Sequence, residues 1–490
     1  MRILLVYPRT PDTFWSFRHV LRLASKAAAL PPLGLLTIAA LLPRRWELRL
    51  VDLNVRKLRD KDVQWADYVM ISAMLIQQDS VRAIVNQCKR LGKPVIGGGP
   101  LFTTSHTSFP EVEHVVIGEA EDLMPSLIAD MEKGRLARFY QSHTHPDITR
   151  SPVPRWDLIN VHDYVTMAVQ FSRGCPFDCE FCDIIVMNGR IPRTKKPEQL
   201  ITELEALREQ GWRHTVFIVD DNFIGNRTQT KELLKNLIAW RRETNAPFSF
   251  ITEASINLAD DTELCELMVE AGFKRVFVGI ETPVDESLSE CRKHQNQRRD
   301  LTQAVRNLQQ KGLDVMAGFI VGFDNDPQDI FKRQFEFIQK SGVVPAMVGL
   351  LQALPQTRLY QRLAREGRLL ANSTGNNTAS ALNFVTRLNR EDLIRGYREL
   401  MRRLYEPRTY YDRIMTFLRE HKPRGPTSPP SWSDIKAFFK SFWVLGVCNR
   451  GRRAFWQFCL RTLIERPRQF RHAMELAIMG YHYRRVAEEL

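Results

Sequence analysis

Short apolar runs alternate with longer amphipathic stretches over the first 145 residues. The apolar runs predict strands at Ile3–Tyr7, Leu48–Leu53, Tyr68–Ser72, Pro94–Gly97 and Val115–Ile117. The stretches between them predict helices at Leu33–Leu42, Asp79–Leu91 and Glu121–Glu132. This alternation is typical of a parallel, doubly wound sheet that binds ligands beyond the carboxyl ends of its strands. We therefore predict an α/β fold that begins with a Rossmann-like domain over residues 1–145.

A second alternating series follows a linker at residues 146–164, which contains three prolines. It predicts strands at Val165–Phe171, Thr215–Val219, Phe248–Thr252, Arg275–Ile280, Val315–Val321 and Ala346–Leu350. Helices are expected at Pro197–Gln210, Gln229–Glu243, Asp261–Ala271, Asp300–Lys311 and Pro327–Ser341, the last with Pro327 at its first position. Six β/α units in series indicate a partial (β/α)6 barrel of the TIM type over residues 165–370. Its chemistry should lie at the C-terminal ends of the strands.

The remainder, residues 371–490, predicts a basic helical region. The chain of 490 residues carries a net charge of +14, and residues 391–490 hold 20 Lys or Arg against 11 Asp or Glu. Aromatic side chains alternate with arginine there, which suits a helix on an anionic membrane surface better than a nucleic-acid site. A solvated helical surface explains the charge equally well.

Nothing in the sequence predicts a membrane span or a signal peptide. No apolar run reaches 18 residues, and the N-terminus reads as a buried strand. We therefore expect a cytoplasmic protein, with peripheral contact to the inner face of the membrane through its basic C-terminal helices.

Three of the eight cysteines lie within eight residues. Cys175, Cys179 and Cys182 have the spacing CxxxCxxC and follow the first predicted barrel strand. Three thiolates can ligate three irons of a [4Fe–4S] cluster and leave the fourth iron open to an outside ligand. A structural zinc site, the alternative, would want a further protein ligand at paired spacing, and the sequence has no second pair.

The cysteine motif resembles the hallmark of the radical S-adenosylmethionine (SAM) superfamily, including the aromatic Phe181 before the last cysteine. The resemblance implies that the open iron binds the amino and carboxylate groups of SAM. An electron from the cluster then cleaves SAM to a 5′-deoxyadenosyl radical. Further cofactor-binding positions implied by the family motifs are Asn222, Gly318, Ile320 and Gly322. Acidic residues at strand ends, expected as catalytic groups around SAM or substrate, are Asp220, Asp221, Glu253 and Glu281. Helix capping is the alternative role for each of them.

The N-terminal domain resembles that of the cobalamin-dependent (class B) radical SAM family. The residues that carry this resemblance, and that it implies bind cobalamin, are Pro32, Gly34, Asp52, Ser72, Gly97, Gly98, Gly99 and Glu119. The DxHxxG signature is absent, so the cobalt is expected without a protein histidine. A flavodoxin-like domain that binds another nucleotide, or none, is the alternative.

The resemblance covers about residues 1–370 and is closest to a subgroup with a helical C-terminal extension, some of whose members methylate hopanoid lipids. Gln356 departs from this pattern, because the usual motif has glycine there and glutamine resists a positive φ.

The activity that the resemblance implies is methylation of an unactivated carbon of a small-molecule or lipid substrate. An external electron donor such as flavodoxin or ferredoxin would reduce the cluster. The alternatives are a cobalamin-dependent cyclisation or rearrangement without methyl transfer, and a tRNA-modifying radical SAM enzyme. A cobalamin or redox sensor that binds nucleic acid is a further alternative, although no nucleic-acid-binding motif supports it.

Overall fold

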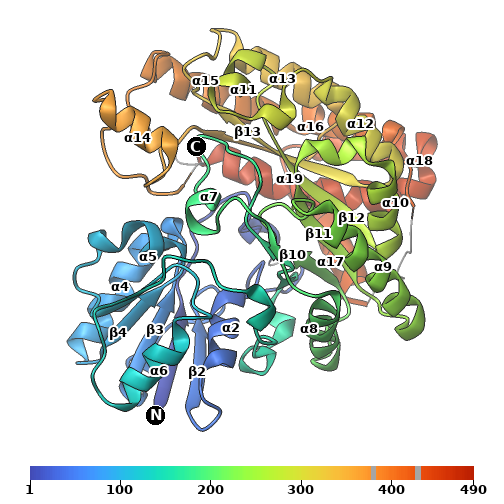
Figure 1. Cartoon of the computed structure of the whole chain (residues 1–490). Coiled ribbons are helices and arrows are strands. Elements are labelled where there is room, and N and C mark those ends of the chain that lie inside the picture. The colour runs from blue at the N-terminus through green and yellow to red at the C-terminus, as the bar shows by residue number, and fades with distance from the viewer. Residues whose placement is uncertain (22, 377–381, 425–431) are drawn as a thin grey trace.

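The computed structural model describes the chain except for residues 22, 377–381 and 425–431. Figure 1 shows the N-terminal domain, in blue, beside a barrel drawn in green and yellow. The C-terminal helices, in orange and red, pack along the barrel.

The N-terminal domain is built on a six-stranded parallel sheet in the order β2-β1-β3-β4-β5-β6. Its strands are β1 (Arg2–Tyr7), β2 (Glu47–Asp52), β3 (Tyr68–Ser72), β4 (Val95–Gly98), β5 (His114–Ile117) and β6 (Phe139–Gln141). Alternate residues of β1 face opposite sides: Leu4 and Val6 pack in one buried cluster, Ile3 and Leu5 in the other. The first cluster is covered by α3 (Asp60–Trp65), α4 (Gln78–Arg90) and α5 (Pro100–Ser105), the second by α2 (Leu33–Leu41) and α6 (Met124–Glu132). The predicted doubly wound sheet is therefore confirmed, with β6 as a strand that the sequence did not predict.

The barrel is a second parallel sheet, in the order β14-β13-β12-β11-β10-β7. Its strands are β7 (Met167–Val169), β10 (Thr215–Ile218), β11 (Ser249–Ala254), β12 (Phe273–Glu281), β13 (Asp314–Val321) and β14 (Ala346–Leu350). The helices between them are α8 (Pro197–Glu209), α9 (Arg227–Thr244), α10 (Thr262–Ala271), α11 (Asp285–Glu290), α12 (Leu301–Lys311) and α13 (Ile330–Ser341). Six parallel strands with helices outside confirm the predicted partial barrel.

The predicted start of the last barrel helix was wrong. Helix α13 begins at Ile330, and Pro327 lies in the preceding turn, where its carbonyl accepts from Ile330 N at 3.0 Å. Asp326 accepts from the backbone N–H groups of Gly322 and Phe323, and these bonds hold the turn in a conformation that delays the helix.

The C-terminal region is helical, as predicted. It contains α14 (Arg358–Arg365), α15 (Arg390–Leu404), α16 (Pro407–Glu420), α17 (Trp432–Trp443), the π-helical turn η8 (Val444–Cys448), α18 (Arg452–Glu465) and α19 (Phe470–Glu488). Tyr397 of α15 and Tyr405, which directly follows that helix, donate to carbonyls of β14, at Val348 and Ala346. Among the described residues, no helix combines the length and the apolar character that crossing a membrane requires.

A buried charge cluster fastens α16 and α19 to the end of the barrel opposite the cysteines. Asp314, at the start of β13, pairs with Arg275 of β12 at 3.0 Å and with His472 of α19 at 2.8 Å. His421, just after α16, lies 3.3 Å from the other carboxylate oxygen of Asp314. A single carboxylate thus joins two barrel strands to two C-terminal helices.

Candidate active site

The three cysteines lie on the loop between β8 (Ser172–Arg173) and α7 (Ile184–Met187), at the C-terminal end of the barrel. Gly174 precedes them with φ +98°, and a Cβ there would lie 3.0 to 3.1 Å from the carbonyl oxygens of residues 188, 189 and 191. Only glycine fits this close, left-handed turn without strain. The turn therefore fixes where the cysteine loop begins.

Three consecutive residues after β10 brace this loop. Asp220 is buried and accepts from the backbone N–H groups of Phe171 and Ser172 at 2.7 and 2.9 Å, and from Ser172 Oγ at 2.6 Å. Asp221 accepts from Gly174 N at 2.7 Å. Burial raises the pKa of Asp220 to about 7. These contacts give both aspartates a positioning role, while direct contact with SAM or substrate stays a prediction.

Asn222, the third of these residues, reaches the first cysteine. Its Nδ2 lies 3.8 Å from Cys175 Sγ and 3.2 Å from Ser255 Oγ, and its Oδ1 accepts from Ser255 N at 3.2 Å. An amide donor at a thiolate sulfur is the kind of contact that tunes an iron–sulfur centre. The residue set therefore fits a cluster at this loop.

A buried ion pair lies beside the cysteines, and the sequence predicted only one of its members, Glu281, as a site residue. Glu281 has φ +64° and accepts from Lys293 Nζ at 2.6 Å. Burial opposes the charge of Lys293, but the Glu281 carboxylate raises the pKa of this lysine above its ordinary value. A Cβ on Gly279 would collide with Glu281 Oε1 and lie 2.7 Å from Lys293 Nζ, so glycine makes room for the pair.

Lys293 and Gln295 were missed from the sequence. They belong to the turn after α11, and Gln295 Nε2 lies 3.8 Å from Cys179 Sγ. No motif or periodicity marks this turn. Only the fold brings it to the cysteines.

Apolar side chains line the interior of the barrel, behind the polar residues that surround the cysteines. Trp15, from the segment between β1 and α2, stacks on Phe217 of β10 with ring centroids 5.9 Å apart and lies 5.2 Å from Phe277 of β12. Gly318 leaves space for the same ring, because a Cβ there would lie 3.0 Å from Phe277 Cζ. Trp15 and Phe277 remain only partly buried.

Glu253 points from β11 into the same interior. In the sheet it pairs in register with Phe277, and within the described chain its carboxylate makes no hydrogen bond. Burial, with the nearby charges of Asp221 and Asp220, raises its pKa to about 8. A carboxyl group without a hydrogen-bond partner, beside the apolar ring of Phe277, is free to meet a ligand.

The end of β13 supports the last cysteine through packing. Phe181 and Ile320 lie against one buried cluster, and the Phe181 and Phe323 ring centroids are 6.2 Å apart. Gly322 has φ +107°, and its N–H donates to Asp326 at 2.7 Å. Ile320 and Phe181 are thus brought to one side of the loop, while Gly318 lies further back on β13, against Phe277.

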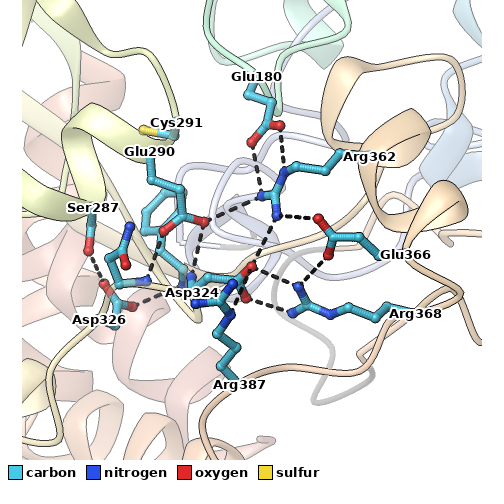
Figure 2. A network of polar contacts seen from close by, with 12 residues as sticks. Glu180, Ser287, Glu290, Cys291, Asp324, Asp326, Arg362, Glu366, Arg368 and Arg387 are labelled. Atoms are coloured by element: carbon cyan, nitrogen blue, oxygen red, sulfur yellow. Dashed lines mark hydrogen bonds and ion pairs between the residues drawn. The ribbon is translucent and has the colours of Figure 1, made fainter.

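An arginine cluster, also missed from the sequence, joins the cysteine loop to α14. Figure 2 shows Glu180, the residue between Cys179 and Phe181, with both oxygens on Arg362, at 2.7 and 3.0 Å. Arg362 also pairs with Asp324 at 3.0 Å, and Asp324 pairs with Arg368 at 2.6 Å. This bidentate geometry holds the loop against the first helix after the barrel.

A pocket lies at the C-terminal ends of the N-terminal strands, with about 420 Å³ of empty space, part of which is open solvent. Its lining includes four of the residues predicted to bind cobalamin, Ser72, Gly97, Gly98 and Gly99, together with Gly118 and apolar side chains of α2 and α6. Gly99 has φ +84°, and a Cβ there would lie 2.5 Å from Ser72 Oγ. Backbone and small residues therefore form the wall, which fits the close approach of a large nucleotide-bearing ligand.

The other four predicted cobalamin residues lie at the rim or elsewhere. A Cβ on Gly34 would lie 3.9 Å from Ser72 Oγ, so Gly34 borders the pocket, and Pro32 immediately precedes α2. Asp52 instead accepts from Asn54 and from Tyr164, and does not line the pocket. Glu119 also turns away from it, towards arginines of the barrel.

Comparison with known proteins decides the family. The radical SAM superfamily model matches residues 169–338, a B12-binding domain model matches residues 20–128, and a domain of unknown function, DUF4070, matches residues 357–490. The chain is 43% identical over 489 residues to the uncharacterized methyltransferase sll1242 of Synechocystis sp., covering 99% of this chain and 91% of the relative. It is 35% identical over 476 residues to the hopanoid C-2 methylase of Rhodopseudomonas palustris, covering 94% and 89%. The chain belongs to the cobalamin-dependent radical SAM methyltransferases.

Solved structures agree on the fold. The radical SAM methyltransferase TsrM of Kitasatospora setae, with cobalamin and a [4Fe–4S] cluster, superposes with a TM-score of 0.62 at 17% identity, over 100% of this chain and 99% of TsrM. The cobalamin-dependent SAM radical enzyme OxsB superposes with a TM-score of 0.63 at 14% identity, over 100% and 81%. As a cobalamin-dependent radical SAM methyltransferase, the chain uses a [4Fe–4S] cluster, SAM and cobalamin. The cofactors and the enzyme class predicted from the sequence are confirmed.

Proposed function

We propose that the enzyme methylates an unactivated carbon of an apolar small molecule or lipid held in the barrel interior. The cluster with SAM supplies a hydrogen-abstracting radical, and cobalamin supplies the methyl group. We assign cobalamin to residues 1–145, the cluster and SAM to residues 165–370, and reduction of the cluster to an external donor such as flavodoxin or ferredoxin.

The observation that carries the substrate class is the apolar layer inside the barrel. Trp15 and Phe277 are only partly buried although they lie in the interior, so they offer apolar surface to a ligand. The unpartnered carboxyl of Glu253 lies on the strand beside Phe277, in register with it, and can orient a polar group or SAM. The hopanoid substrate of the Rhodopseudomonas relative belongs to the same apolar class.

The test uses anaerobically reconstituted enzyme with SAM labelled with deuterium in its methyl group. A pentacyclic hopanoid should gain one labelled methyl group, detected by mass spectrometry, whereas a water-soluble indole should not. Trp15→Gln should raise KM for the hopanoid while 5′-deoxyadenosine still forms. Trp65→Gln is the matched control, because Trp65 of α3 is also partly buried but packs against Arg49 of β2, in the N-terminal domain. Deoxyadenosine formed with no methylated hopanoid would refute the proposed substrate class, and a rearranged unmethylated product would favour the alternative outcome.

Peripheral contact with the cytoplasmic face of the membrane through the C-terminal helices is part of the proposal. An exposed apolar face, defined as Phe439, Trp443, Val447, Trp456, Leu460, Leu463 and Ile464, covers α17, η8 and α18. Its members recur every three to four residues, so each helix presents them on one side. Phe439, Trp443 and Ile464 are 68%, 63% and 72% exposed. Trp456 donates to Gly446 O at 2.9 Å, which joins the two rows into one face.

The charge around this face supports an anionic bilayer as the proposed partner. Residues 438–471 contain eight basic residues and one acidic residue, Glu465. Arg450, Arg452, Arg453 and Arg468 are exposed. Aromatic and aliphatic side chains ringed by arginine are typical of interfacial helices on anionic lipid.

Vesicle flotation tests this contact. The full chain should float with vesicles containing one third phosphatidylglycerol, less with pure phosphatidylcholine, and less at high salt. Trp443→Ser combined with Leu460→Ser should remove flotation. Ile191→Ser is the control, because Ile191 is 80% exposed on the cysteine loop, outside the apolar face. Flotation that the double variant leaves unchanged would refute the assigned surface.

A further inference from the structure

The four residues after β5 face two ways. Gly118 and Ala120 line the pocket of the N-terminal domain. Glu119 and Glu121, which alternate with them, point to the barrel and pair with its arginines. Gly118 has φ +89°, and the chain turns there, so one short loop contacts the pocket through one pair of residues and the barrel arginines through the other.

The barrel side of this loop is a buried set of charge-assisted bonds. Arg173 Nη1 lies 2.7 Å from Glu119 Oε2, and Arg173 Nη2 lies 2.8 Å from Glu121 Oε1. Arg193 Nη2 lies 2.7 Å from Glu119 Oε1. The carboxylates are 7% and 4% exposed. Removing one of these four side chains would leave an uncompensated buried charge. The pairing between the loop and the two arginines is therefore strongly favoured over separation.

The two arginines mark the two ends of the cysteine loop. Arg173 lies on β8, and Arg193 lies on β9 (Arg193–Thr194), which pairs antiparallel with β8. Residues 174–192 between them include all three cysteines. Glu119 therefore holds both the entrance and the exit of the cysteine loop with one carboxylate.

Other contacts fix the arginines in place. Arg173 Nε donates to Gln170 Oε1 at 2.8 Å, and Arg193 Nη2 donates to Asn188 O at 3.0 Å. Ser151 Oγ donates to Glu121 Oε1 at 2.5 Å. With the donors saturated in this way, a shift of residues 118–121 moves the cysteine loop with them.

We propose that residues 118–121 couple cobalamin binding to cluster loading, with Glu119 and Glu121 as positioning residues between the two sites. A ligand that orders Gly118 and Ala120 orders the paired carboxylates, and these order the loop that ligates iron. Coupling is reciprocal, so the cluster tightens cobalamin binding by the same factor by which cobalamin tightens retention of the cluster. The inference depends on the cofactors of the family and not on the substrate proposed above.

The test measures cobalamin affinity directly, without turnover. Hydroxocobalamin is titrated by absorption into anaerobic protein with and without its reconstituted cluster. Wild-type protein should bind at least about fivefold more tightly when the cluster is present, the lower end of typical coupling. Glu119→Gln keeps the shape of the side chain but removes its charge, and should bring this ratio close to one. Iron release to a chelator, measured with and without hydroxocobalamin, should show the same loss of coupling.

Two further variants keep the result interpretable. Arg193→Gln should also reduce the ratio, because it frees one end of the loop, and it serves if Glu119→Gln does not fold. Glu132→Gln is the matched control, because Glu132 makes an exposed pair with Arg45 on the same domain and should leave the ratio unchanged. A ratio near one in the wild-type protein, or a ratio that Glu119→Gln and Arg193→Gln both leave at the wild-type value, would overturn the proposal.

Discussion

Asp314→Asn should destabilise the chain far more than an ordinary loss of an ion pair. Asp314 and Arg275 are 8% and 16% exposed, and the same carboxylate also meets His472 and lies close to His421. Breaking a buried pair by removing one charge costs about 3–5 kcal/mol, because the partner stays buried and uncompensated. For a unit the size of the barrel, about 2–4 °C per kcal/mol gives a fall in Tm of about 6–20 °C.

The same substitution on the surface supplies the comparison. Asp412 pairs with Arg461 at 3.0 Å, but the two side chains are 56% and 39% exposed. An exposed pair contributes about 0–1 kcal/mol, so Asp412→Asn should change Tm by no more than about 4 °C. Thermal denaturation followed by circular dichroism at neutral pH measures both variants. Equal Tm values for the two would refute the idea that Asp314 fastens the C-terminal helices to the barrel.

Three further substitutions test separate parts of the structure. His472→Gln should flatten the alkaline part of the pH–stability profile. Burial lowers the pKa of His472, but the Asp314 carboxylate raises it to a net value above 6.5. The stabilisation by protonated His472 is therefore complete in mild acid and is lost as pH rises through the raised pKa. A wild-type Tm that does not fall over that range would contradict this. Gly99→Ala should weaken hydroxocobalamin binding at least about tenfold in an absorption titration. The left-handed φ of Gly99 resists a side chain, and the new Cβ would meet Ser72 Oγ in the pocket wall. An unchanged Kd would show that the pocket does not hold cobalamin there. Gly279→Ala should lower the free energy of unfolding by about 1–3 kcal/mol, because the new methyl group would collide with the Glu281–Lys293 ion pair. Urea unfolding that matches the wild type would exclude this overpacking.

Sequence periodicity was enough to predict both sheets, because it is set by which residues face the core. Leu4 and Val6 alternate with Ile3 and Leu5 along one strand, and that pattern is local to the chain. The three-residue strand β6 was missed because so short a segment carries too little pattern. Gln356 departs from what its residue type favours: it adopts φ +66°, the conformation that glutamine was expected to resist, and its side chain donates to Thr104 O at 3.1 Å.

The candidate site was predictable only where chemistry and spacing lie in one segment. Cys175 and its neighbours form such a segment. Lys293 approaches the cysteines from a turn more than a hundred residues later, and its buried partnership with Glu281 depends on the fold. Glu119 was predicted to bind cobalamin from the family resemblance, yet its side chain pairs with arginines of the barrel. Long-range pairing of charges leaves no signature in the order of residues.

The placement of Trp15 has a consequence for any recombination among relatives of this chain. Its indole forms part of the barrel floor, although it belongs to the segment that precedes the first helix of the cobalamin domain. Nearby, His482 of the last helix bonds to Thr13 O at 2.9 Å, so the same segment is anchored by the far end of the chain. Exchanging the first domain for that of another enzyme would therefore replace a side chain inside the barrel, at the place where we propose that the substrate binds. A chimera should therefore take part of its substrate preference from the enzyme that supplied its N-terminal domain.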